Sequence, residues 1–180
     1  MFSELDVLRV VSERLDAAQI PYMLTGSYAL AFYTTPRMTR DLDLVIALGE
    51  DDVGAIVKVF ESDFYIDVDD VRSAVHSRSQ FNLMHLKSGI KVDLIIRKAA
   101  EYRQIEFARR QQVNFAGVKT WIVTKEDLIL SKLDWAKDSG SELQQRDVRS
   151  LMNDSVDRAY VEQWAKRLGV DALLRSVDDE

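Results

Sequence analysis

The sequence predicts an α+β (α/β) fold, in which a small β-sheet is flanked by helices and a helical subdomain follows. A length of 180 residues with 47% hydrophobic side chains suffices for one compact domain with a small appendage, but not for two large domains. Short apolar runs alternate with stretches of helical periodicity as far as residue 117, and helical stretches dominate the rest. No Gly/Ser-rich linker intervenes. We therefore predict an α/β core over residues 1–117 and a helical C-terminal subdomain over residues 118–180, packed on the core.

The first elements follow from apolar spacing and from turn residues. Helical spacing predicts an opening helix over residues 4–19, and an apolar run predicts a strand over residues 22–25. Gly26-Ser27 then turns this strand into a second helix. A loop over residues 34–40 leads into a strand over residues 41–46.

The later elements follow from the same patterns. Lys87-Ser88-Gly89 separates two alternating runs, residues 81–86 and 90–96, which predicts an antiparallel hairpin. Further short strands are predicted at residues 64–68, 112–115 and 118–123. Further helices are predicted at residues 50–62, 69–77, 99–110, 125–137, 142–152 and 157–168.

Composition excludes several classes of protein. The absence of cysteine rules out disulfides, thiolate nucleophiles and Cys-based zinc sites, and two histidines are too few for a histidine metal cluster. The N-terminus has no basic region followed by an apolar stretch, and no apolar run approaches the length of a membrane span, so we expect a soluble, cytoplasmic protein without membrane association. A net charge of -6 argues against extended non-specific binding of nucleic acid. A local excess of arginine and lysine between Arg97 and Arg110 is the segment where RNA could dock, although such a run is usually a solvated helix face.

Asp41 and Asp43 are the first candidate catalytic residues. Alternation along a strand places both carboxylates on one face, while Leu42 and Leu44 point into the core. Two like charges so close together need a cation, and Mg²⁺ prefers carboxylate oxygens and completes its shell with substrate phosphates. The alternative is an edge strand with two solvated aspartates.

Gly26 and Ser27 are candidate nucleotide-binding residues. The start of a helix after a strand offers unpaired backbone N–H groups and a positive dipole end, which favour phosphate. Gly26 allows a phosphate to approach the backbone, and the Ser27 hydroxyl can donate to a phosphate oxygen. The alternative for Ser27 is helix capping alone.

Asp93 is the third acid. It lies between Val92 and Leu94 in a strand whose apolar positions occupy the other face, so its carboxylate is expected to face outwards. If this strand lies beside that of Asp41 and Asp43, three carboxylates converge and can hold two metal ions across a transferring phosphoryl group. The alternative is an exposed acid paired with Lys91 or Arg97.

In combination, these motifs resemble the DNA polymerase β nucleotidyltransferase superfamily, whose pattern is Gly-Ser, Asp-x-Asp and a third acid. The matching segments are Leu24–Ser27, Arg37–Leu44 and Lys91–Ile95. With the segments Glu126–Leu133 and Arg146–Val148, the chain looks like the AbiEii-type bacterial nucleotidyltransferases of abortive infection. One departure is Leu30–Tyr33, where the minimal nucleotidyltransferases of the superfamily carry a second small-residue motif.

The resemblance implies a small mixed β-sheet nucleotidyltransferase core and assigns roles to the motif residues. Gly26 and Ser27 would hold the triphosphate, and Asp41 and Asp43 would bind Mg²⁺ or Mn²⁺. Asp93 would bind metal or deprotonate the acceptor.

Lys132 and Asp147 are carried over as nucleotide-binding residues. The alternatives are a surface lysine whose stem lies along the protein and a surface turn in which Arg146 and Asp147 form an ion pair.

The expected activity is magnesium-dependent transfer of a nucleoside monophosphate from an NTP, such as ATP, to a hydroxyl of RNA (tRNA) or of a protein. The setting that the resemblance implies is a toxin–antitoxin or phage-defence system, with a cognate toxin or antitoxin as partner. Two alternatives remain open. One is a small-molecule nucleotidyltransferase of the aminoglycoside type, and the other is a non-catalytic nucleotide-binding or interaction module that retains the fold.

Overall fold

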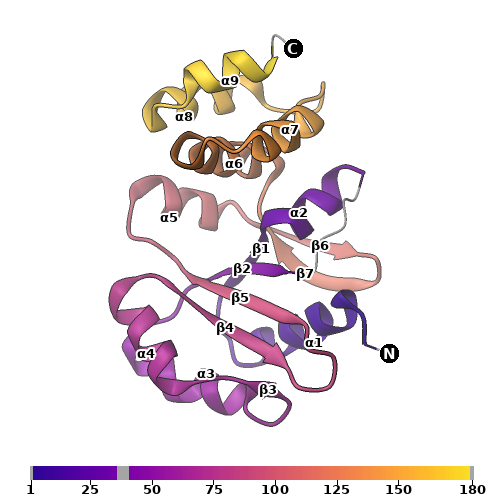
Figure 1. Cartoon of the computed structure of the whole chain (residues 1–180), viewed down its shortest axis with the longest axis vertical. Coiled ribbons are helices and arrows are strands. Elements are labelled where there is room, and N and C mark those ends of the chain that lie inside the picture. Colours follow the sequence, from indigo (N-terminus) through magenta and orange to yellow (C-terminus); the bar gives the residue numbers. More distant parts are fainter. Residues whose placement is uncertain (1, 36–40, 179–180) are drawn as a thin grey trace. The chain divides into compact units, whose positions relative to one another are not determined.

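The computed structural model describes residues 2–35 and 41–178 (Figure 1). The chain forms two compact units. The first, here called the α/β unit, comprises Met1–Tyr28 and Arg37–Val123. The second, here called the helical unit, comprises Ala29–Pro36 and Thr124–Glu180.

Within the described residues, the α/β unit is built on a mixed sheet of seven strands in the order β3-β4-β5-β2-β1-β7-β6. Two pairs, β2 with β5 and β1 with β7, are parallel, and the other neighbours are antiparallel. The strands are β1 Tyr22–Thr25, β2 Leu42–Ile46, β3 Phe64–Tyr65, β4 Gln80–His85, β5 Lys91–Ile96, β6 Gln111–Phe115 and β7 Val118–Ile122.

Helix α1 (Glu4–Ala17) covers one face of the sheet. A capping box between Ser3 and Asp6 begins the helix, and its apolar side is fully buried. The hydroxyl of Ser12 on this side lies 3.0 Å from that of Thr120 on β7, which shows that α1 lies against the Thr120 face. Because side chains alternate along strands and share a face across paired residues, this is also the face of Leu24, Leu44 and Leu94. The core of the unit therefore lies between α1 and this face.

Other helices complete the α/β unit. The chain between β2 and β3 forms a short 3₁₀ turn, η1 (Glu50–Asp52), and then α3 (Val53–Phe60). Helix α4 (Val68–Ser77) contacts α3 and β4, and α5 (Glu101–Ala108) follows β5 (Figure 1). Helix α2 (Gly26–Tyr33) begins directly after β1, and the chain passes from one unit to the other within it.

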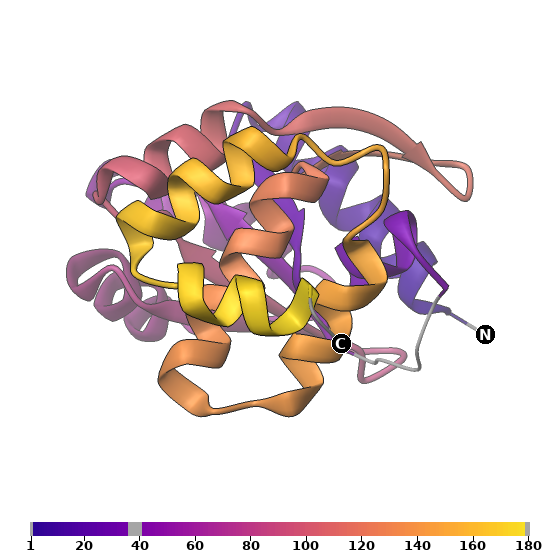
Figure 2. The ribbon, with the colours of Figure 1, turned by 90° about the horizontal axis from the view of Figure 1, so that it is seen from above.

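The helical unit contains four further helices. Helices α6 (Lys125–Ser139) and α7 (Glu142–Leu151) form a hairpin that turns at Gly140, and α8 (Arg158–Leu168) and α9 (Asp171–Asp178) pack on this hairpin (Figure 2). Thr124, Ser141 and Asp157 each cap the helix that follows them by accepting a backbone N–H bond. No helix within residues 2–35 and 41–178 is long and apolar enough to cross a membrane.

The predicted α+β class is confirmed, and most predicted elements lie within two residues of their observed bounds. The strand predicted at residues 64–68 is shorter, because Asp67 instead caps α4 by accepting bonds from Asp69 and Asp70. Helix α9 was missed. Most of the predicted loop, residues 36–40, lies outside the described residues. The boundary predicted after residue 117 falls inside the β6–β7 hairpin, whereas the units divide after Val123, because β7 pairs with β1 within the sheet.

Candidate active site

The turn between β1 and α2 places the backbone against Asp43. Gly26 has a φ of +64°, and it begins α2 immediately after Thr25, the last residue of β1. A Cβ atom added at Gly26 would clash with Oδ2 of Asp43 and would lie 3.0 Å from its Cγ. Only glycine therefore fits here, both for its backbone conformation and for the space that the Asp43 carboxylate occupies. Ser27, the second residue of α2, is half-buried.

Asp43 and Asp93 are direct neighbours across the parallel pair β2–β5. The same row of the sheet continues to Thr25 on β1 and to Asn82 on β4. Paired residues share a face, so all four side chains lie on the face opposite to the one that α1 covers. Asp41 precedes Asp43 by two residues and is exposed. The sheet therefore brings Asp43 and Asp93 together, because β2 and β5 are neighbours and both residues lie on the same face.

Asp93 is buried, contrary to the prediction that it faces solvent. Only 9% of its surface is exposed, although it lies on the face opposite to Val92 and Leu94. Its Oδ2 lies 3.1 Å from Nζ of Lys91, two residues earlier on the same face of β5. Its Oδ1 is buried and has no hydrogen-bond partner among the residues that the structure describes. Burial with one unsatisfied oxygen is costly for a carboxylate, which points to a further ligand at Oδ1.

The carboxylate oxygens of these acids are suitable ligands for magnesium or manganese, but the acids are not arranged as a complete metal site. Among residues 2–35 and 41–178, no three carboxylate or imidazole side chains are grouped so that they could hold a metal ion. The predicted cluster of Asp41, Asp43 and Asp93 is therefore not preformed. Two features still fit a hard cation: carboxylate oxygens are its preferred ligands, and Oδ1 of Asp93 lacks a partner in the described part of the chain.

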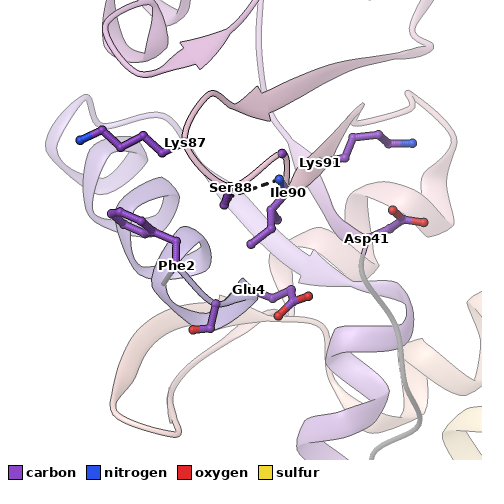
Figure 3. A pocket seen from close by; sticks show the side chains of 9 residues that line it. Phe2, Glu4, Asp41, Lys87, Ser88, Ile90 and Lys91 are labelled. Carbon is purple, nitrogen blue, oxygen red and sulfur yellow. Dashed lines mark hydrogen bonds between the residues drawn. The ribbon is translucent and has the colours of Figure 1, made fainter.

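A cavity of about 820 Å³ opens beside these acids. Asp41 and Lys91 line one end of it, and Phe2 and Lys87 line the other, with Glu4 and Ile90 between them (Figure 3). All of its lining residues belong to the α/β unit. The cavity offers space for a substrate next to the acidic face.

Lys132 and Asp147, the other predicted nucleotide-binding residues, bind each other inside the helical unit. Nζ of Lys132 lies 2.7 Å from Oδ2 of Asp147 and donates to Oε1 of Gln144 at 3.1 Å. Both charged side chains are only 5% exposed. The alternatives of a surface lysine and of a surface turn are therefore wrong, because these residues form a buried ion pair between α6 and α7.

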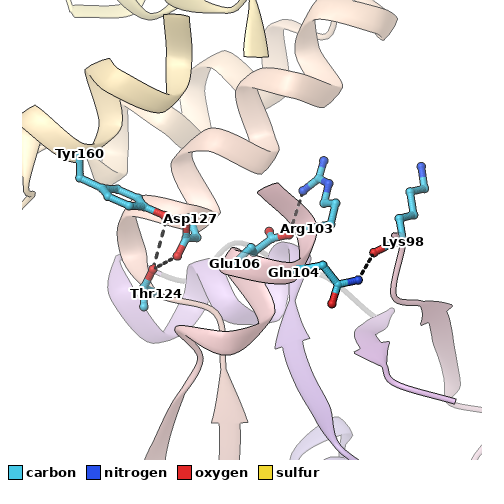
Figure 4. A network of polar contacts seen from close by, with 7 residues as sticks. All are labelled: Lys98, Arg103, Gln104, Glu106, Thr124, Asp127 and Tyr160. Atoms are coloured by element: carbon cyan, nitrogen blue, oxygen red, sulfur yellow. Dashed lines mark hydrogen bonds and ion pairs between the residues drawn. The ribbon is translucent and has the colours of Figure 1, made fainter. Parts of the chain in front are cut away.

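The basic segment around α5 is occupied by contacts within the α/β unit. Arg103 pairs with Glu106 at 3.0 Å (Figure 4), and the guanidinium groups of Arg97 and Arg110 lie over the ring of Phe107. Much of the positive charge in the basic segment therefore stabilises the fold.

In the helical unit, Asp127 accepts hydrogen bonds from Thr124 and Tyr160 at 2.6 and 2.8 Å (Figure 4).

The sequence named Lys91 only as an alternative ion-pair partner of Asp93, a pairing that the structure shows, and not as a member of the site. Asp93 raises the pKa of Lys91 chiefly through their hydrogen bond, and the charges of Asp41 and Asp43 raise it further. The ammonium group therefore lies within the field of all three acids. The spacing of Lys91 and Asp93 was a signal, because residues two apart on a strand share a face.

Gly26→Ala tests the contact between the turn and Asp43. We expect a loss of about 1–2 kcal/mol of stability from the left-handed backbone, together with a displaced Asp43 and loss of any nucleotide binding at this turn. Gly117→Ala is the matched control, because Gly117 has a φ of +84° and open space where its Cβ would be. Thermal unfolding and nucleotide titration of both variants measure the two effects. Unchanged nucleotide binding in Gly26→Ala would contradict a role for the turn.

Known proteins resemble this chain in structure. No protein-family model and no curated protein sequence matches it. The antibiotic-resistance factor ANT(2'')-Ia superimposes with a TM-score of 0.58 and 13% identity, covering 96% of this chain and 91% of that protein. A nucleotidyltransferase-like antigen of Paracoccidioides brasiliensis superimposes with a TM-score of 0.57 and 20% identity, covering 97% and 91%. The lincosamide antibiotic adenylyltransferase LnuA, with lincomycin bound, gives 0.53 and 14%, covering 83% and 96%.

These similarities establish that the chain has a nucleotidyltransferase fold. At such low identity, they carry the fold alone.

Proposed function

We propose that this protein transfers a nucleoside monophosphate from an NTP to an acceptor hydroxyl. The observation that carries the proposal is the position of Asp43, which lies against the Gly26 turn and pairs across the sheet with Asp93. A phosphate-binding turn and two carboxylates thus meet on one face of a nucleotidyltransferase fold. A protein that only kept the fold would have no requirement for this combination.

Each residue of the proposed site has a separate role in nucleotidyl transfer. The acceptor oxygen bonds to the α-phosphorus, the bond from that phosphorus to the bridging oxygen breaks, and pyrophosphate leaves in line. Backbone N–H groups at the start of α2 and the Ser27 hydroxyl orient the triphosphate, which the absence of a side chain at Gly26 allows. The proton of the acceptor hydroxyl goes to a carboxylate oxygen of Asp93, the role that the resemblance implies for this residue beside metal binding.

Asp41, Asp43 and Asp93 are the residues that would hold Mg²⁺ or Mn²⁺, and such an ion supplies neutralising charge at the transferring phosphoryl group. We also propose, from the resemblance to AbiEii-type proteins, that Lys132 and Asp147 support nucleotide binding. Their mutual ion pair makes ordering of the α6–α7 hairpin the simplest form of that support.

Two classes of acceptor follow from different observations. The resemblance to AbiEii-type proteins supports RNA or a protein, in a toxin–antitoxin or phage-defence setting. The charge supports a small cationic molecule, because an acidic protein with net charge -6 attracts amines and repels RNA. In line with the second class, ANT(2'')-Ia has been captured with adenylyl-2''-tobramycin, at a TM-score of 0.52 and 14% identity, covering 94% of this chain and 95% of that protein.

Incubation with each of the four α-³²P-labelled NTPs and Mg²⁺ tests the function and the acceptor together. Cell extract, purified tRNA and an aminoglycoside panel are the acceptors, and electrophoresis and thin-layer chromatography separate labelled macromolecules from labelled small molecules. We expect one NTP to label one acceptor class. Chelation should abolish both labelling and tight NTP binding in calorimetry, because unscreened carboxylates repel the triphosphate. Binding without turnover of any NTP would instead support the non-catalytic module.

A further inference from the structure

Lys91 places a positive charge inside the acidic face. Its Nζ lies 3.1 Å from Oδ2 of Asp93, and its side chain is 39% exposed, whereas that of Asp93 is 12% exposed. The lysine therefore reaches in from the accessible side, where the cavity lined by Asp41 and Lys91 opens (Figure 3).

The strand register explains why this charge serves more than one carboxylate. Lys91 and Asp93 share a face of β5, and Asp43 is the direct neighbour of Asp93 on β2. Asp41 lies two residues before Asp43. The charges of all three acids raise the pKa of Lys91, with Asp93 contributing most. One ammonium group thus offsets part of the repulsion among three carboxylates.

The pairing leaves Asp93 half-satisfied. Oδ2 is bonded to Lys91, but within residues 2–35 and 41–178 the buried Oδ1 has no partner. A carboxylate with one ion-paired oxygen and one buried oxygen that lacks a partner is expected to bind a further ligand at the second oxygen. A divalent cation binds such oxygens with twice the charge of the lysine, and both cations would draw on the same carboxylate.

We propose that Lys91 is the counter-ion of Asp93 in the metal-free site and that it competes with the divalent cation for this carboxylate. The ion pair between Lys91 and Asp93 must open before Asp41, Asp43 and Asp93 can bind metal together. This inference rests on the proposed function. It accounts for the fact that the three acids are not grouped as metal ligands among the described residues, although Asp43 and Asp93 are neighbours. Lys91 is in this account a positioning residue. If the ion pair only stabilised the fold, its removal would leave the affinity for metal unchanged or would lower it.

Lys91→Met tests the competition, because methionine keeps the length of the side chain and removes its charge. Lys87→Met is the matched control, since it removes the same charge from an exposed position in the same hairpin. The readout is Mn²⁺ affinity without nucleotide, measured by the electron paramagnetic resonance of free Mn²⁺. We expect Lys91→Met to bind Mn²⁺ about tenfold or more tightly than the wild type, as for removal of a charge at hydrogen-bond distance. Lys87→Met should change affinity by less than about threefold, because exposed charges are screened.

Thermal unfolding gives an independent measure. In the presence of a chelator, Lys91→Met should melt below the wild type, because the carboxylates lose their counter-ion, and Mn²⁺ should raise its melting temperature by more than it raises that of the wild type. Lys91→Arg keeps the charge and should retain wild-type affinity. If Lys91→Met does not fold, Lys91→Gln takes its place with the same expected gain.

The outcomes separate the two proposals. If the wild type binds Mn²⁺ and transfers nucleotide, but Lys91→Met binds the ion equally or more weakly, the role of Lys91 is overturned and the proposed function stands. If neither the wild type nor the Lys91 variants bind Mn²⁺, the metal site fails, and the proposed function fails with it. If Lys87→Met gained as much Mn²⁺ affinity as Lys91→Met, the gain would follow from the loss of any nearby positive charge. The proposed competition would then be overturned.

Discussion

Asp43→Ala is expected to abolish nucleotidyl transfer while the protein still folds. Asp43 lies between the Gly26 turn and Asp93, so its carboxylate is central to the proposed site. Loss of a metal ligand at this position should remove at least about 4 kcal/mol of transition-state stabilisation, which is a drop of about 10³ in rate. The side chain is only partly buried, so stability should change by about 1 kcal/mol or less. Single-turnover labelling and chemical unfolding measure the two quantities.

The control for Asp43→Ala has to remove a carboxylate that makes no ion pair or helix cap needed for the fold. Asp63 is unsuitable, because Arg14 holds it with two bonds of 2.6 and 2.8 Å, and Asp67 is unsuitable because it caps α4. Asp51→Ala is the better control, since Asp51 is exposed in η1 and its carboxyl group has no role in the site. If Asp43→Ala folds and labels an acceptor within tenfold of the wild type, the nucleotidyltransferase proposal is wrong.

Lys132→Met is expected to destabilise the helical unit by about 3–5 kcal/mol, because it leaves the buried Asp147 without its cation. Both side chains are 5% exposed, and their 2.7 Å ion pair joins α6 to α7. Urea unfolding followed by far-ultraviolet circular dichroism measures the loss. The unfolding transition should be the readout rather than activity, since a destabilised hairpin would lower activity for any reason.

The double variant Lys132→Met/Asp147→Leu separates the loss of an ion pair from the burial of an unpaired charge. Replacement of both partners by apolar side chains should recover most of the stability that the single variant loses, because no charge is then left buried alone. The exposed Lys137, which donates to the carbonyl of Leu168, gives the control Lys137→Met, with an expected loss of about 1 kcal/mol or less. A loss in Lys132→Met no larger than in this control would show that the pair contributes little.

Much of the candidate site could be predicted from the sequence, because its signals are local. Alternation around Leu42 and Leu44 was enough to place Asp41 and Asp43 on one side of a strand, and the observed burial of β2 follows that pattern. Gly26 directly after an apolar run predicted the strand-to-helix turn that the structure shows. Periodicity and turn chemistry are properties of a few consecutive residues, so they can be seen without the fold.

The surroundings of Asp93 and Lys132 could not be predicted in this way. Both were expected to be accessible, since polar side chains on strands and helices usually face solvent. The structure buries both of them. Asp93 pairs with Lys91 on the same strand, and Lys132 pairs with Asp147, which lies 15 residues further along the chain on a different helix. Whether a charged side chain becomes buried depends on how separate elements pack, and periodicity within one element carries no such information.

The sequence by itself thus determined the α+β class, the order of most elements, the Gly26 turn and the alternation that places the acids on one face. Only the tertiary structure decided that β2 and β5 are parallel neighbours, that β7 joins the sheet beside β1, and that Lys91 stands among the acids. The physical reason is that local structure follows from backbone geometry and apolar spacing, whereas strand order and buried ion pairs follow from the burial of surfaces contributed by residues far apart in the chain.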